Sequence, residues 1–173
     1  MALIVENGTG LVDAESYISV ADADTYHSNR GNTAWATYTT SVKEQLLRKA
    51  TDYIEQVYRL RWLGYRHTED QALSYPRDEV PRRDFTFLNQ FSFYPNDEVP
   101  TEVKNACAEF ALRANAEALA PDIARIATRE KVGSLEVEYD VNSPAYVIYR
   151  AIDNLVAPFL NSLSGNIKRV VRT

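Results

Sequence analysis

The chain has 173 residues, 45% of them hydrophobic and 25% charged, which is typical of one globular domain with a sizeable core. Nowhere does it approach a run of about 18 apolar residues, the length of a membrane-spanning helix, and no secretory signal is expected at its N-terminus. The net charge of −5 argues against a protein that coats nucleic acid electrostatically. A single cysteine, Cys107, excludes an intramolecular disulfide and favours a reducing compartment.

Two capping patterns predict the first helices. Ser19 precedes a segment of helical periodicity, so a helix is expected over 20–30. Ser41 and Glu44 have the spacing of a capping box, and the apolar residues behind them predict a helix that ends near Arg61. The second of these helices should be amphipathic.

The segment 99–119 is predicted to be the central helix, because its apolar residues recur at helical spacing around most of its surface. Ser143 and Pro144 stand in cap and first-turn positions of a last helix, which Pro158 should kink or end. Between these two helices, alternation over 135–139 predicts a strand paired in a β-hairpin with residues near 127–131.

The predicted fold class is therefore mainly α, a small bundle of about four helices with a β-hairpin. One domain should cover 1–173, with an N-terminal arm at 1–18 and a C-terminal tail at 164–173. Residues 62–98 break the helical pattern and form a long loop that is rich in aromatic residues and proline. A connection of this length is normally functional or flexible, and its aromatic residues argue for packing or contacts between subunits.

Catalytic and metal-binding patterns are absent from the sequence. The two histidines, His27 and His67, have no zinc-site spacing, and no glycine-rich phosphate-binding motif occurs. Asp22, Asp24 and His27 could approach a metal from one helical face, but capping and solvation explain them better. We therefore expect no enzyme activity, no metal and no cofactor.

The aromatic loop has two interpretations. Its rings could stack on single-stranded bases while Arg77, Arg82 and Arg83 hold phosphates, which would give binding with a steep salt dependence. Asp78, Glu79 and Asp84 cancel these arginines locally, so packing or protein contact is favoured from the residues alone.

Several stretches in one order resemble a known family. They are DAESYISVADADTYHSNRGN, KEQLLRKATDYIE, QALSYPR, VPTEVKNACAEFALRA and EKVGSLEVEYD. Together they are similar to tailed-bacteriophage proteins often labelled DnaT-like single-stranded-DNA-binding proteins, which look like head–tail connector (adaptor or head-completion) subunits. Tyr75 stands where a tryptophan is usual in that family.

This resemblance implies a structural virion protein that forms a homo-oligomeric, dodecameric ring beneath the portal. The ring would extend the DNA channel, so that genomic DNA passes without sequence-specific binding, and it would dock a tail or tail-completion protein. The expected location is the head–tail interface of the virion, and the host cytoplasm during assembly, with no membrane partner. The alternative is a single-stranded-DNA-binding accessory protein of replication.

Under the connector interpretation, three sets of residues are candidates for contacts. The C-terminal tail would bind the portal or another partner through Ile167, Lys168, Arg169, Val170, Val171, Arg172 and Thr173. The aromatic loop would join subunits through Trp62, Tyr65, Phe85, Phe87, Phe91, Phe93 and Tyr94. An acidic lumen or rim would be formed by Asp22, Asp24, Glu136 and Glu138.

Overall fold

The computed structural model describes residues 2–82, 92–121, 129–132, 135–138 and 148–161, with the backbone alone described at 129–132 and 135–138. These residues form helices, short strands and one 3₁₀ turn. In chain order they are α1 (Val20–Asn29), α2 (Thr33–Ala36), α3 (Thr40–Tyr58), β1 (Tyr65–Arg66), β2 (Arg77–Asp78), α4 (Thr101–Arg113), β3 (Arg129–Val132), β4 (Leu135–Glu138), α5 (Arg150–Val156) and η1 (Ala157–Phe159).

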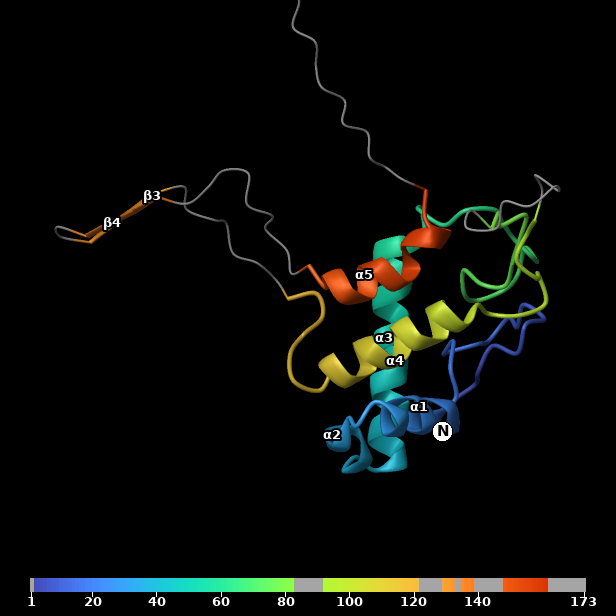
Figure 1. Ribbon diagram of the computed structural model, residues 1–173, viewed down its shortest axis with the longest axis horizontal. Helices are drawn as coiled ribbons and strands as arrows, with labels where there is room; N and C mark the ends of the chain where they lie inside the picture. The colour runs from blue at the N-terminus through green and yellow to red at the C-terminus, as the bar shows by residue number, and fades with distance from the viewer. Residues whose placement is uncertain (1, 83–91, 122–128, 133–134, 139–147, 162–173) are drawn as a thin grey trace, which may run out of the picture.

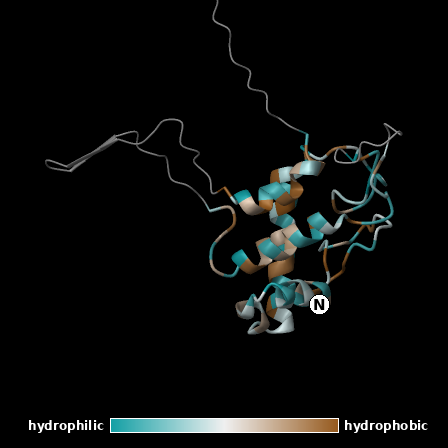
Figure 2. Ribbon diagram, viewed as in Figure 1, coloured by the Kyte–Doolittle hydropathy of each residue, from teal (hydrophilic) through white to brown (hydrophobic). Residues whose placement is uncertain are grey.

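The core forms where α4 packs against its neighbours. Figure 1 shows α3 as the long helix that α1 and α4 cross, and α4 also contacts α5. Hydrophobic residues gather on the helices around this crossing, while hydrophilic ones cover the outer faces (Figure 2). The buried side chains of α4 are Val103, Ala106, Cys107, Ala108, Phe110 and Ala111. Most of these side chains are small, so the backbones of neighbouring helices can approach closely. Burial also raises the pKa of the Cys107 thiol to about 11.

The predicted fold class is confirmed, because the described residues are mainly helical and contain a β-hairpin. In the hairpin β3 pairs antiparallel with β4, from Arg129 opposite Glu138 to Val132 opposite Leu135. The prediction for Pro158 is also confirmed, since α5 ends at Val156 and the chain continues as the 3₁₀ turn η1. The expectation of one helix that runs on from Ser143 and Pro144 is wrong, because Ile148 and Tyr149 are not helical and α5 begins at Arg150. Residues 143–147 themselves lie outside the described residues.

Two other helix boundaries also differ from the prediction. Helix α3 begins at Thr40, and the Thr39 hydroxyl accepts the hydrogen bond from the Val42 backbone N–H at 3.4 Å, so Thr39 and not Ser41 is the cap. The residues around it are all competent caps, and the sequence pattern cannot separate them. Glu44 instead lies 3.9 Å from Arg48 on the next turn.

Helix α4 is shorter than predicted and ends at Arg113. The chain then turns, because Asn115 donates a hydrogen bond to the Tyr38 hydroxyl at 2.9 Å and Glu117 accepts one from the Tyr149 hydroxyl at 3.3 Å. These side-chain contacts hold the segment after α4 against other parts of the fold, and periodicity alone does not reveal them.

Residues 2–18, expected as an arm, contribute Tyr17 and Ile18 to the core. The Tyr17 hydroxyl donates to a Glu55 carboxylate oxygen. The Ser74 backbone N–H in turn donates to the Tyr17 hydroxyl oxygen and to the same Glu55 oxygen, each at 3.0 Å. Burial, followed by the charge of Glu55, raises the pKa of Tyr17 well above its ordinary value. This network ties the N-terminal segment, α3 and the aromatic loop together.

No helix among the described residues is long and apolar enough to cross a membrane.

Candidate functional site

The aromatic residues of the 62–98 segment divide into a buried group and an exposed pair. Trp62 is only 3% exposed, and its ring lies 5.1 Å from that of Tyr75 in an edge-on contact. Trp62 therefore belongs to the core and is not available to a contact surface. In contrast, Tyr65 is 69% exposed and Phe93 is 46% exposed, although both are large apolar rings.

The exposed pair lines one hollow of about 680 Å³, which we call the aromatic hollow. Its lining residues come from β1, from β2 and the residue after it, and from the segment before α4: Tyr65, Asp78, Glu79, Phe93, Tyr94, Pro95 and Asn96. Tyr94 is half-buried beneath it, and its ring lies 4.8 Å from that of Phe159. Phe85, Phe87 and Phe91, predicted for the same surface, lie outside the described residues.

Short backbone pairings position the two rings. Tyr65 of β1 is the register partner of Asp78 in β2. Past β2, the Tyr94 backbone N–H donates to the Val80 carbonyl at 2.9 Å, which sets Pro81 opposite Phe93. Two-residue strands are too short to produce a recognisable alternation, so the sequence could not reveal this framework.

Gly64 is required just before Tyr65. Its φ is +68°, a conformation that favours glycine, and a Cβ atom there would lie 2.1 Å from the Asp78 carbonyl oxygen. The absence of a side chain thus lets β1 approach β2 and brings Tyr65 to the edge of the hollow.

Arg77, in β2, binds the backbone that leads into Tyr65. Its guanidinium donates hydrogen bonds to the carbonyls of Leu63 at 2.7 Å, Gly64 at 2.7 Å and Ser74 at 3.2 Å. The residue is 8% exposed, and burial lowers its pKa. The expectation that Arg77 holds phosphates is therefore wrong, because the residue is buried and each of its three guanidinium nitrogens donates to a backbone carbonyl.

The charged groups at the hollow are mixed in sign. Asp78 accepts hydrogen bonds from the Asn96 amide at 2.6 Å and lies 3.1 Å from His67 Nδ1, and these contacts hold its pKa below the ordinary value. The exposed Arg82 guanidinium lies 4.8 Å from the centre of the Tyr94 ring, a cation–π contact. Arg82 thus places a positive charge at the surface beside a ring that lines the hollow, and Arg83 lies outside the described residues.

Two of the four residues predicted for an acidic lumen or rim, Asp22 and Asp24, have local partners in the described structure. Asp22 exchanges hydrogen bonds with Ser19 at the start of α1, which is a capping role. Asp24 accepts from Trp35 Nε1 at 2.7 Å and from the Lys43 ammonium at 2.8 Å. The side chains of Glu136 and Glu138 on β4, and the tail 167–173, lie outside the description.

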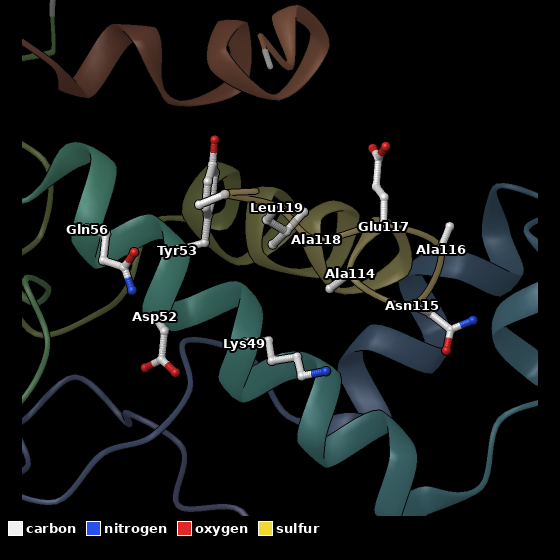
Figure 3. Close-up of a pocket in the computed structure, with 11 residues that line it drawn as sticks. Lys49, Asp52, Tyr53, Gln56, Ala114, Asn115, Ala116, Glu117, Ala118 and Leu119 are labelled. Atoms are coloured by element: carbon white, nitrogen blue, oxygen red, sulfur yellow. The ribbon is translucent and has the colours of Figure 1, made fainter. Parts of the chain in front are cut away.

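A second hollow, of about 620 Å³, lies between α3 and the turn after α4. Figure 3 shows Lys49, Asp52 and Gln56 along α3 and Asn115 and Glu117 on the turn, with the Asp52 and Glu117 carboxylates pointing away from each other. Its remaining wall is largely alanine, and its one ring, Tyr53, also packs 4.8 Å from Phe110 in the core. No motif in the sequence marks this hollow, apart from the alanines at 114, 116, 118 and 120 that form much of its wall.

The third hollow, of about 330 Å³, is lined by Asp24, His27, Lys43 and Trp35 among others. The Trp35 and His27 rings are almost fully buried, and the Asp24 and Lys43 charges pair with each other. Neither this hollow nor the second offers an exposed aromatic face. Among the described residues, no group of three or more His, Cys, Asp or Glu could hold a metal ion.

The described fold and site thus define a small, mainly helical protein with an exposed pair of aromatic rings beside an arginine. A family model described as "Putative DnaT-like ssDNA binding protein" matches residues 1–173. The chain belongs to this family. Comparison with curated proteins and with solved structures gives no match.

The family match corrects the main interpretation drawn from the sequence. The matched family is described by single-stranded-DNA binding and not as a head–tail connector. The identification as a connector subunit was therefore wrong, and so were the partners inferred from it: the ring beneath a portal, the portal itself, the tail protein and DNA that passes without being bound. The match favours the alternative, a DnaT-like single-stranded-DNA-binding protein.

Proposed function

We propose that this protein binds single-stranded DNA, with Tyr65 and Phe93 as the surfaces on which bases stack. The observation that carries the proposal is the exposure of both rings on one hollow, in a chain of a family described by this activity. Every base has a π-face, so exposed aromatic rings can hold a strand without sequence-specific contacts. Burying these rings against bases would also remove apolar surface from water.

The charges beside the hollow define how the strand is held. Arg82 supplies a cation at its edge, whereas Asp78 and Glu79 place carboxylates on its lining. With Arg77 committed to backbone carbonyls, few described cations near the hollow are left for phosphates. Stacking is therefore the main source of affinity, and the phosphate contribution is small.

Binding to a fluorescently labelled oligonucleotide, followed by anisotropy at low salt, tests this proposal. Tyr65→Ala and Phe93→Ala should each weaken binding roughly 5- to 150-fold, since removing one base–aromatic stack costs about 1–3 kcal/mol. Tyr65→Phe keeps the ring and should bind almost as the natural protein does.

The matched control is Leu60→Ala. Leu60 is an apolar side chain with 95% exposure that does not line the hollow, so its loss should leave binding unchanged. The proposal is overturned if the natural protein does not bind single strands at low salt. It is equally overturned if both ring-deleting variants, shown to be folded by circular dichroism, bind with undiminished affinity.

A further inference from the structure

The aromatic hollow also carries hydrogen-bond acceptors, and stacking makes no use of them. Two carboxylates, of Asp78 and Glu79, line the same hollow as the Tyr65 and Phe93 rings. An ionised carboxylate can accept hydrogen bonds but cannot donate them. Carboxylates also repel phosphates, so a strand that enters here must present its bases and keep its backbone away.

The two carboxylates differ in how many hydrogen bonds they already accept from described residues. Asp78 Oδ1 already accepts from the Asn96 amide at 2.6 Å and lies 3.1 Å from His67 Nδ1, which fixes the orientation of the group. The contacts that lower the pKa of Asp78 keep it ionised at neutral pH. Its second oxygen, Oδ2, lies 3.3 Å from His67 and retains further accepting capacity.

Glu79 has more accepting capacity still. Within the described part of the chain, no hydrogen bond reaches its carboxylate. Its backbone φ is +57°, which is uncommon for a residue with a side chain and is a feature that occurs at binding sites. Glu79 therefore lines the hollow with an acceptor that has no partner among the described residues.

Bases differ in what they offer to such acceptors. Cytosine presents an amino group at N4 and adenine one at N6, whereas thymine presents carbonyl oxygens at the corresponding edge. A carboxylate beside a stacked cytosine or adenine can accept a hydrogen bond from that amino group. Beside a stacked thymine it meets the O4 acceptor, and the one donor of thymine, N3–H, lies between two carbonyl oxygens whose partial negative charges repel the carboxylate. The hollow thus combines a stacking surface that any base can use with an edge contact that is more favourable for amino-bearing bases than for thymine.

We infer that the aromatic hollow is a base-binding subsite that prefers amino-bearing bases to thymine, with Asp78 and Glu79 as the specificity-determining residues. This inference rests on the proposed binding of single-stranded DNA and names the substrate class of that same site. Cytosine and thymine give the cleanest comparison, because both are single-ring pyrimidines and their homopolymers carry equal phosphate charge.

The test compares dissociation constants for oligo-dC and oligo-dT of equal length at one salt concentration. The natural protein should bind oligo-dC about fivefold or more tightly. Asp78→Asn and Glu79→Gln exchange an acceptor-only group for one that also donates, so each should reduce the ratio, chiefly by strengthening oligo-dT binding. Glu69→Gln removes the same charge from an exposed residue outside the hollow and should leave the ratio unchanged.

The outcomes separate this inference from the function on which it rests. Binding of both oligonucleotides with equal affinity overturns the base preference and leaves single-strand binding intact, whereas binding of neither overturns the proposed function itself. A preference that survives in both Asp78→Asn and Glu79→Gln would assign the discrimination elsewhere and overturn the role of these carboxylates. Because Asn and Gln are close in size to the natural residues, circular dichroism of each variant verifies that the fold is retained.

Discussion

His27 is a buried histidine with a hydrogen-bonding partner at each ring nitrogen. It is 1% exposed; Nε2 lies 3.1 Å from the Ala108 carbonyl oxygen and Nδ1 lies 3.0 Å from the Asn32 amide nitrogen. Both contacts are satisfied by the neutral tautomer in which Nε2 donates and Nδ1 accepts. The sequence offered His27 as a possible metal ligand, but the structure uses it to join α1 to α4.

This arrangement predicts an acid-sensitive stability. Burial lowers the pKa of His27 in the folded state, so the unfolded chain binds the proton more readily. Its contribution is complete above the unfolded pKa of about 6.5 and is lost as the pH falls below that value, at up to about 1.4 kcal/mol per pH unit. Urea unfolding at several pH values between about 7.5 and 5 measures the slope.

The variant His27→Gln provides the control for this prediction. It should be less stable than the natural protein at pH 7.5, because it loses ring contacts in the core, and its stability should depend less on pH across the same window. Identical pH slopes for the two proteins would show that another group titrates there.

At the scale of elements, two glycines have the same backbone conformation but different surroundings. Replacing each by alanine therefore distinguishes the cost of steric contact from the cost of backbone strain. Gly64 has φ +68° and Gly31 has φ +70°, but a Cβ atom at Gly31 would meet nothing within 4 Å. Gly31→Ala should therefore cost only the backbone term of about 1 kcal/mol. Gly64→Ala adds the collision with the Asp78 carbonyl, so β1 must move away from β2.

We expect Gly64→Ala to lower the free energy of unfolding by at least about 2 kcal/mol and to weaken oligonucleotide binding, because Tyr65 and Asp78 both move. Gly31→Ala should leave binding unchanged. Urea unfolding and anisotropy measure the two effects, and equal losses for both glycines would contradict the close approach of β1 and β2.

Elements differ in how far the sequence could predict them. The periodic segments of α1, α3 and α4 and the alternating segment of β4 are long enough to indicate helix or strand. Those four predictions are confirmed, apart from the positions at which the helices begin and end. The aromatic hollow could not be predicted in the same way. Trp62, Tyr65 and Phe93 look alike in the sequence, and only the packing of Trp62 onto Tyr75 and the pairing of β1 with β2 bury the first and expose the others.

The same limit applied to charge. Arg77 and Arg82 are equivalent in the sequence, but the carbonyls of Leu63, Gly64 and Ser74 bind the first and leave the second at the surface. Which cation is free to meet a phosphate is decided by tertiary contacts that join residues many positions apart. The family match supplied the class of ligand, and the structure supplied the residues that can meet it.

For the whole molecule, the net charge of −5 is the property that single-strand binding must accommodate. Each phosphate neutralised on a single strand contributes a slope of about −0.7 to the dependence of log K on log salt. If stacking on Tyr65 and Phe93 dominates and Arg82 is the main cation beside the hollow, the slope should be near −1. This is shallower than the steep dependence expected when Arg77, Arg82 and Arg83 were all counted as phosphate contacts.

Anisotropy titrations between about 20 and 200 mM salt measure that slope. Arg82→Ala should reduce the magnitude of the slope by about 0.7, since one phosphate contact is lost. The control is Arg59→Ala, which should leave the slope unchanged because Arg59 is exposed and does not line the hollow. A slope steeper than about −3 would show that several other cations hold the backbone. In that case the strand would be bound by charge on another face, and the aromatic hollow would not be the main binding surface.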